Sequence, residues 1–308
     1  MRAVLDALRS PAFRAIFMVA AIAAAIWAVI GNWDEVSAAL SRLDWWIVVL
    51  SLVVSIIFVI LTMLAWRVIL NDAGEPVGKG PARRIFYVSQ VAKYLPGGVW
   101  NFVAAAEMGA DYNISRRRSV TVLLMSMAVS VVTGLALAAI AIVFGPSGTS
   151  AYWWVLLVLP VLAIVLYPPV LNRLIDKGLA LIKRDRLERP FTGKAITVAA
   201  LFSTASWIIA GLQVFLILTG LGNEARIDTY ILTVGGYALA WVVGFLVFFI
   251  PAGVGVRELA LGATLAGLVP GGDVVVVVLL SRILFTVADL LLGLGASFQM
   301  RRDARSIT

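Results

Sequence analysis

Apolar side chains run along this chain in long stretches, of which only 152–171 is interrupted by prolines, and polar residues gather in the short segments between them. Each stretch is long enough for a helix to cross the roughly 30 Å hydrocarbon core of a bilayer. The stretches cover residues 12–31, 45–66, 120–144, 152–171, 196–221, 230–250 and 274–298. We find none of the alternating segments of about ten residues that mark the strands of a membrane barrel. The pattern therefore predicts an all-α polytopic membrane protein.

The composition narrows the chemistry that such a protein can perform. Hydrophobic residues make up 62% of the 308 residues and charged residues 14%. Soluble domains have about 45–50% and about 25%. The chain contains no cysteine and no histidine, which excludes disulfides, thiolate metal sites and histidine-based catalysis. We expect neither a metal ion nor a cofactor.

The placement of basic residues predicts the topology. Of the 25 Lys and Arg residues, 20 lie on the N-terminus, the tail and alternate connections, whereas the opposite connections hold only Arg42 and Arg226. Because cytoplasmic flanks collect Lys and Arg, we place both termini in the cytoplasm of a bacterial-type inner membrane. The excess of positive charge therefore indicates topology and contact with anionic lipid headgroups, as at the loop 172–194, and not binding to nucleic acid.

Two further segments are assigned by requiring that successive connections alternate between the two sides of the membrane. Segment 85–109 lies between two basic clusters, so it returns to the side from which it came, as a re-entrant hairpin or as an amphipathic helix on the surface. Segment 253–269 is expected to cross as a short helix broken by glycine. The prediction is eight crossings and one re-entrant hairpin. They form a single transmembrane domain over 1–308, with halves at about 1–154 and 155–308.

A similar Pro/Gly-broken segment occurs in each half. Residues 94–99 read Tyr-Leu-Pro-Gly-Gly-Val and residues 249–254 read Phe-Ile-Pro-Ala-Gly-Val. The residues that break the backbone are Pro96, Gly97, Gly98, Pro251, Gly253 and Gly255. Irregular backbone at membrane depth is tolerated only where protein or a water-filled cavity covers it. Paired breaks in two halves point to a transporter site, although two ordinary helix ends would share this pattern, and the halves could be parallel or inverted repeats.

Six charged residues remain once the connections are counted. They are Lys93, Arg257, Arg282, Glu107, Glu258 and Asp289. A lone charge at the bilayer centre costs about 2.5–3.5 kcal/mol on insertion scales, so such residues are usually paired or functional. Arg282 and Asp289 are seven residues apart on one helix face, which must point into the bundle.

These residues predict a phosphate-binding pocket. Arg257, Arg282 and Lys93 offer the donors that bind phosphate, and Tyr94, Trp100 and Asn101 flank the first break. The carboxylates of Glu258, Asp289 and Glu107 would balance the cations or carry a coupling proton. The alternative is mutual neutralisation that only locks the bundle.

Three motifs together carry a resemblance to a known family. They are Lys-Tyr-Leu-Pro-Gly-Gly-Val-Trp at 93–100, Arg-Arg-Arg at 116–118 and Pro-Ala-Gly-Val-Gly-Val-Arg-Glu at 251–258. In this order they resemble the lysylphosphatidylglycerol synthase transmembrane-region family, also called flippase-like membrane proteins. Many relatives carry a basic residue and a carboxylate just after the first Pro-Gly, where this chain has Gly98 and Asn101.

The resemblance implies a lipid flippase-like domain. In full-length aminoacyl-lipid synthases this region precedes a soluble catalytic domain. Because the sequence ends at Thr308, soon after the last apolar stretch, we expect a stand-alone member that is not an enzyme. Stand-alone relatives are thought to move lipids or polyprenyl-linked sugars between leaflets.

The leading hypothesis is a transporter that flips a lipid with a phosphate-bearing headgroup. The lipid would be a polyprenyl-phosphate-linked sugar or an aminoacylated or anionic phospholipid. No Gly-x-x-x-x-Gly-Lys-Ser/Thr motif is present, so the energy would come from a gradient or from the substrate's own imbalance. One alternative is a membrane glycosyltransferase with a lipid-linked donor, suggested by Asp34 and Glu35. Another is a non-catalytic subunit of a cell-envelope assembly complex.

Overall fold

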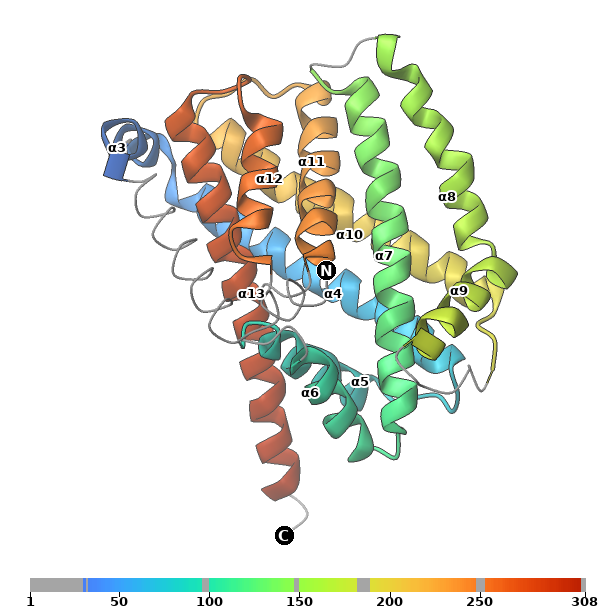
Figure 1. Cartoon of the computed structure of the whole chain (residues 1–308). Coiled ribbons are helices and arrows are strands. Elements are labelled where there is room, and N and C mark those ends of the chain that lie inside the picture. The colour runs from blue at the N-terminus through green and yellow to red at the C-terminus, as the bar shows by residue number, and fades with distance from the viewer. Residues whose placement is uncertain are drawn as a thin grey trace, which may run out of the picture.

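The computed structural model is a bundle of helices, shown in Figure 1, and describes residues 30–31, 33–95, 100–146, 150–181, 189–247 and 253–305. Five helices are long and apolar enough to cross a membrane. They are α4 (Trp45–Asp72), α7 (Arg116–Phe144), α10 (Gly193–Gly220), α11 (Ile227–Leu246) and α13 (Gly271–Arg305). The prediction of an all-α polytopic membrane protein is therefore confirmed.

A sixth apolar stretch is bent at its prolines. The 3₁₀ helix η1 (Ser150–Leu157) continues into α8 (Val158–Leu166), and α9 (Pro168–Leu181) follows at an angle of 76°. Tyr167, at the bend, has the extended backbone that a following proline imposes. By length and composition the two parts together could make one more crossing.

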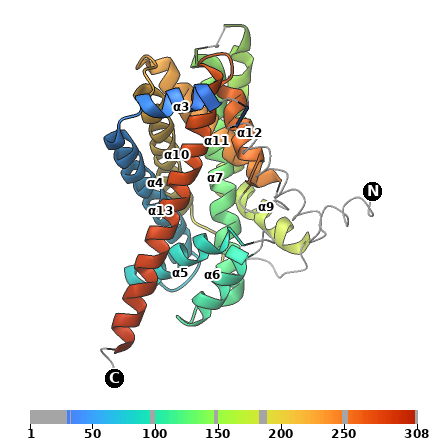
Figure 2. The same ribbon diagram turned by 90° about the vertical axis from the view of Figure 1, so that its left-hand side faces the viewer.

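Hydrogen bonds between helix termini define the two ends of the bundle. At one end, Asp72 of α4 accepts two hydrogen bonds from Thr192, and Arg118 of α7 donates to the carbonyl oxygen of Leu70. We call this the basic end, because α7 and α10 begin here and carry Arg116 and Lys194 in their first turns. At the other end, the short helix α3 (Trp33–Arg42) lies across the bundle, as Figure 2 shows, and we call this the α3 end.

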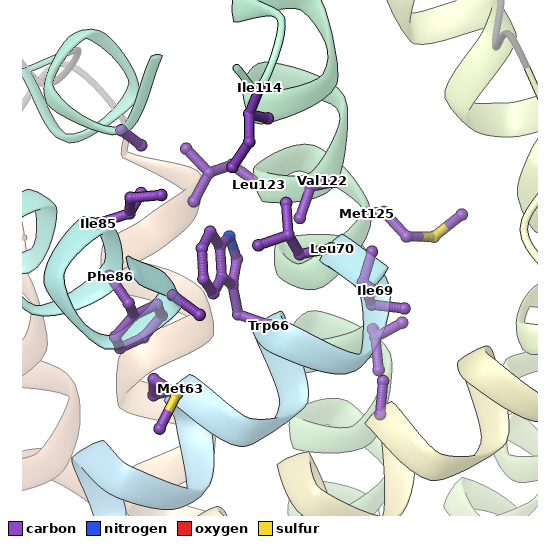
Figure 3. Close-up of a cluster of buried hydrophobic side chains, with 14 of the residues drawn as sticks. Met63, Trp66, Ile69, Leu70, Ile85, Phe86, Ile114, Val122, Leu123 and Met125 are labelled. Atoms are coloured by element: carbon purple, nitrogen blue, oxygen red, sulfur yellow. The ribbon is translucent and has the colours of Figure 1, made fainter. Parts of the chain in front are cut away.

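A helical hairpin enters the bundle from the basic end. Helix α5 (Lys79–Ala92) runs inward and α6 (Trp100–Ala110) packs against it on the way back. Figure 3 shows how the hairpin is held. Phe86 and Ile85 of α5 lie against Trp66 of α4, and the rings of Trp66 and Phe86 are 5.4 Å apart. The hairpin expected for residues 85–109 is present, although α5 begins six residues earlier than expected.

A second hairpin enters from the α3 end. Helix α12 (Val256–Leu265) turns back along α11. A Cβ atom added at Gly236 would lie 2.8 Å from Thr264, and one added at Gly244 would lie 2.3 Å from Arg257. The small glycines of α11 therefore let α12 pack at very close range, as small residues do between membrane helices.

The second hairpin changes the expected number of crossings. With ten residues, α12 is about 15 Å long, which is half of the hydrocarbon thickness, so it does not cross alone as expected for 253–269. The positive φ angles of Gly253 and Gly255 delay the start of the helix until Val256. Among the described residues, five helices could cross by length and composition, or six with the bent pair, where eight crossings are expected; α11, one of the five, is also the first arm of this hairpin. The expected first crossing, 12–31, lies almost wholly outside these residues.

The two hairpins point toward each other from opposite ends of the bundle. Figures 1 and 2 show α5 and α6 at the basic end and the α11–α12 pair at the opposite end, with α13 passing both tips. The two broken segments of the sequence are thus arranged in opposite directions along the bundle. This is the arrangement that inverted-topology repeats produce in transporters.

Candidate functional site

Two charged side chains of α13 face the tips of the two hairpins. Arg282 and Asp289 lie on the same side of the helix, as their spacing of seven residues predicts. Asp289 is only 4% exposed, and Arg282 is half-buried. At about 1.5 Å per residue, the two residues are about 10 Å apart along α13, near the middle of its apolar length.

Asp289 binds the tip of the first hairpin. Its carboxylate lies 2.7 Å from the Lys93 ammonium and accepts a 2.6 Å hydrogen bond from the Tyr94 hydroxyl. Lys93 also donates a hydrogen bond to Gln90. These contacts satisfy a carboxylate that would otherwise be costly at this depth. We call Lys93, Tyr94 and Asp289 the lower clasp.

Arg282 binds the tip of the second hairpin, at the start of α12. Its Nε atom lies 3.2 Å from Oε1 of Glu258, in the first turn of α12. The Arg282 guanidinium also lies 6.0 Å from the centre of the Tyr94 ring, so this upper clasp, Arg282 with Glu258, adjoins the lower one. Both side chains keep about a fifth of their surface accessible, 22% and 18%. The breaks in the two halves of the sequence therefore meet at one charged cluster.

Arg257 lies in the same region but contacts an aromatic ring instead of a carboxylate. Its guanidinium lies 5.4 Å from the ring centre of Trp241, which is a cation–π contact. It forms no ion pair or hydrogen bond with the residues whose positions the structure defines, and its buried Nε atom is without a partner there. The turn before it needs glycine, because Gly253 and Gly255 have φ angles of +67° and +83°. A Cβ atom at Gly253 would also lie 2.9 Å from the Arg257 Nε atom.

A pocket opens beside this cluster. It holds about 330 Å³ of empty space when its open mouth is included. Its lining includes Arg257, Glu258, Arg282, Tyr237, Trp241 and Phe285. The three charged residues come from the second break and α13, and the three rings come from α11 and α13. The pocket has room for a small polar group between charges and aromatic walls, as binding sites usually do.

Sequence reasoning did not identify the aromatic wall of the pocket. Tyr237, Trp241 and Phe285 lie within apolar stretches, where a ring gives no signal of its own. Trp241 did carry one usable signal, because it lies deep in a span and not at the membrane interface where tryptophan gathers. Its ring stacks on that of Phe245, with the planes 7° apart.

Glu107 lies away from the charged cluster. It is half-exposed in α6 and forms an ion pair with Arg116 at the start of α7, with two hydrogen bonds of 2.8 and 2.7 Å. These bonds hold the pKa of the Glu107 carboxyl below its ordinary value. The residue closes the base of the first hairpin, and the cluster is left with three cations and two carboxylates.

The other residues expected at the first break are only partly described. Trp100 and Asn101 begin α6, and neither belongs to the pocket lining. Trp100 is 44% exposed. Pro96, Gly97, Gly98 and Pro251 lie outside the described residues.

Asp34 and Glu35, which suggested a glycosyltransferase, lie on α3 at the far end of the bundle. Glu35 accepts a hydrogen bond from the backbone N–H of Gly272 and so caps the start of α13. Nearby, Arg42 binds the buried Asp273 at 2.5 Å and also donates to the carbonyl oxygen of Leu221. In the described part of the chain, no group of three or more Asp or Glu residues is placed to hold a metal ion.

The sequence also matches a known family model. The model described as the lysylphosphatidylglycerol synthase TM region matches residues 15–293, a range that contains both hairpins and both clasps. A search of curated proteins gave no significant match.

Proposed function

Because the chain belongs to the lysylphosphatidylglycerol synthase transmembrane-region family, we propose that it moves a lipid with a phosphate-bearing headgroup between the leaflets of the membrane. One observation supports this function above the others. Three cations meet at the tips of two opposed hairpins in an otherwise apolar bundle, and one of them, Arg257, forms no ion pair or hydrogen bond with the described residues. A buried arginine without an ion pair is costly, and a phosphate from the substrate would supply one.

Each residue of the cluster has a role in the proposed mechanism. Arg257 binds a phosphate oxygen with its unused Nε donor, and Arg282, which lines the same pocket from α13, would exchange its ion pair with Glu258 for the phosphate. Lys93 adds a point charge from the first hairpin. The acyl or prenyl tails stay in the surrounding lipid, because the pocket is too small for them.

Movement of the headgroup would follow from release of one clasp at a time. When the phosphate binds Arg282, it competes with Glu258, and the second hairpin loses its ion pair with α13. When Asp289 is protonated, its pair with Lys93 is lost, and the first hairpin is freed. Alternate release would open the pocket toward one end and then the other, as alternating access requires. Glu258 and Asp289 are thus the candidates for proton coupling.

The proposal also includes the orientation of the protein in the membrane and its partners. We place the basic end in the cytoplasm of a bacterial inner membrane, where its Lys and Arg residues would contact anionic headgroups. The proposed partners are a membrane lipid or a lipid-linked sugar. The proposal assigns no chemical step to the chain, because Glu35 is engaged in capping α13 and lies far along that helix from the pocket.

Leaflet exchange in proteoliposomes tests the proposal. The purified chain is reconstituted with a fluorescent lipid, and the fraction accessible to an external quencher is followed over time. We expect the wild-type chain to accelerate exchange of at least one phosphate-bearing lipid. Substitution of Arg257→Gln should slow it about tenfold or more, equivalent to about 1.4 kcal/mol.

A matched variant separates this effect from a general loss of charge. Arg226→Gln removes an exposed arginine that pairs with Asp228 at the start of α11, outside the pocket. It should exchange lipid at the wild-type rate. Equal rates for Arg257→Gln and Arg226→Gln, with both variants folded, would rule out Arg257 as the phosphate site. A wild-type chain that accelerates no lipid would refute transport itself.

A further inference from the structure

The pocket presents one unused donor beside one unused acceptor. The Nε atom of Arg257 and the Oε2 atom of Glu258 are both buried, and neither has a hydrogen-bond partner among the residues that the structure describes. Arg282 takes only the other oxygen of Glu258. Buried polar atoms are nearly always hydrogen-bonded, so such a pair marks the place of an absent group. The missing group must accept at one point and donate at another.

The charges of the cluster do not cancel. Among the described residues, Lys93, Arg257 and Arg282 carry three positive charges, while Glu258 and Asp289 carry two negative ones, which leaves one positive charge. Glu107, which would have balanced the count, binds Arg116 at the base of the first hairpin. The connecting segments 96–99 and 248–252, which lie outside the described residues, contain no ionisable residue in their sequence.

From this count we infer that the substrate headgroup is a single phosphodiester with a hydroxylated, uncharged remainder, such as a glycosyl or glycerol group. This inference rests on the proposed function and narrows it. One phosphodiester charge brings the cluster to zero, the state of lowest cost inside a membrane. Its phosphoryl oxygen meets the Arg257 Nε–H, and a hydroxyl of the headgroup donates to the free oxygen of Glu258.

The same count disfavours the other headgroups. A diphosphate or a phosphomonoester brings about two negative charges and leaves the cluster negative. A zwitterionic headgroup leaves the positive charge of the empty site in place. An aminoacylated phosphatidylglycerol with a lysyl group adds net positive charge. Both carboxylates of the cluster already pair with a cation, so an added ammonium would have to share its carboxylate with Arg282 or Lys93.

Equilibrium binding tests the inference separately from transport. The purified full-length chain in detergent is titrated with fluorescent phosphatidylglycerol, and unlabelled lipids compete. The competitors are phosphatidylglycerol, a polyprenyl-phosphoryl hexose, phosphatidic acid, phosphatidylethanolamine and lysylphosphatidylglycerol. We expect the two single phosphodiesters to bind about tenfold more tightly than the other three, a difference of about 1.4 kcal/mol. The ranking of these two distinguishes a glycerol headgroup from a glycosyl one.

Two substitutions shift the charge of the cluster in opposite directions. Glu258→Gln raises it by one unit and should move the preference toward phosphatidic acid. Arg257→Gln lowers it to zero and should move the preference toward phosphatidylethanolamine. Glu107→Gln is the matched control, because it makes the same chemical change outside the pocket and should leave the ranking unchanged.

The outcomes separate the two proposals. Equal binding of all five competitors, or tightest binding of lysylphosphatidylglycerol, would overturn the inference. The inference would also be overturned if Glu258→Gln and Arg257→Gln ranked the lipids as the wild type does, provided that thermal unfolding shows both variants to be folded. A preference for single phosphodiesters without exchange in proteoliposomes would support the inference on binding and refute transport.

Discussion

Arg282 and Asp289 lie two turns apart on one face of α13, and each binds the tip of a different hairpin. The arginine pairs with Glu258 of the hairpin that enters from the α3 end, and the aspartate pairs with Lys93 of the hairpin that enters from the basic end. One continuous helix is therefore the shared support of two broken segments that lie 155 positions apart in the sequence. A change at either position should act on one hairpin and spare the other.

The lower clasp should contribute measurably to stability. Asp289→Asn keeps the shape of the side chain but leaves the Lys93 ammonium at depth without its carboxylate. We expect unfolding to become easier by about 3 kcal/mol, the scale for breaking one partner of a buried pair. Thermal unfolding in detergent measures the change.

The double variant Lys93→Met with Asp289→Leu tests the cause. It removes both charges, so it should be more stable than Asp289→Asn. In a double-mutant cycle its loss of stability should be smaller than the sum of the losses of Lys93→Met and Asp289→Leu alone, as a direct pair requires. Additive losses would contradict a direct interaction.

The glycine turn before α12 should set the position of Arg257. Gly253→Ala places a Cβ atom 2.9 Å from the Arg257 Nε atom in a left-handed conformation that costs about 1–2 kcal/mol for alanine. Lipid exchange should fall together with stability. Gly222→Ala is the matched control, since its φ is +94° and nothing lies within 4 Å of the added atom. It should lower stability to a similar degree while exchange persists; loss of exchange in both variants would trace the effect to folding alone.

Close helix packing should depend on Gly235. A Cβ atom there would lie 2.1 Å from that of Ala141 and 2.7 Å from the carbonyl oxygen of Leu137, so Gly235→Ala forces α11 away from α7. We expect a loss of about 1–3 kcal/mol from overpacking, measured by thermal unfolding. Gly178→Ala, in α9, meets nothing within 4 Å and should be neutral or slightly stabilising. Equal stability of the two variants would mean that α11 and α7 can move apart without a loss of stability.

The orientation in the membrane can be read with single cysteines, because the chain has none of its own. Glu224→Cys lies on the exposed connection at the α3 end, and Arg189→Cys lies on the exposed connection at the basic end. A membrane-impermeant maleimide should label Glu224→Cys in intact cells and Arg189→Cys only after permeabilisation. The reverse pattern would invert the proposed topology.

The membrane class and the directions of most helices along the bundle could be predicted from the sequence. The length of an apolar stretch and the charges that flank it are local properties of the chain. The sequence also predicted that Arg282 and Asp289 share a face, since that depends only on helical periodicity. The bend at Pro168 follows in the same way from the proline ring. The length of α12 was not predictable from hydropathy, because apolar residues surround the turn that delays its start.

The partners of the buried charges depended on tertiary packing. Seven residues separate Arg282 from Asp289, yet each binds a residue far away in the sequence, and no local pattern shows which one. The apolar sequence around Glu107 is typical of a buried charge. However, α6 ends beside Arg116, and Glu107 forms its ion pair with that residue. Apart from the depth of Trp241 in its span, the aromatic side of the pocket gave no signal, because its rings are ordinary residues for an apolar helix.

The spacing of the two clasps also determines how a transported charge experiences the membrane voltage. About 10 Å along α13 separates them, which is about one third of a 30 Å core. A full crossing of one elementary charge is worth about 2.3 kcal/mol per 100 mV, so passage between the clasps is worth about 0.8 kcal/mol in a uniform field. With the basic end in the cytoplasm, a negative-inside potential drives a monoanionic headgroup toward the α3 end. Export of such a lipid would then be electrogenic, and the voltage itself would supply its direction.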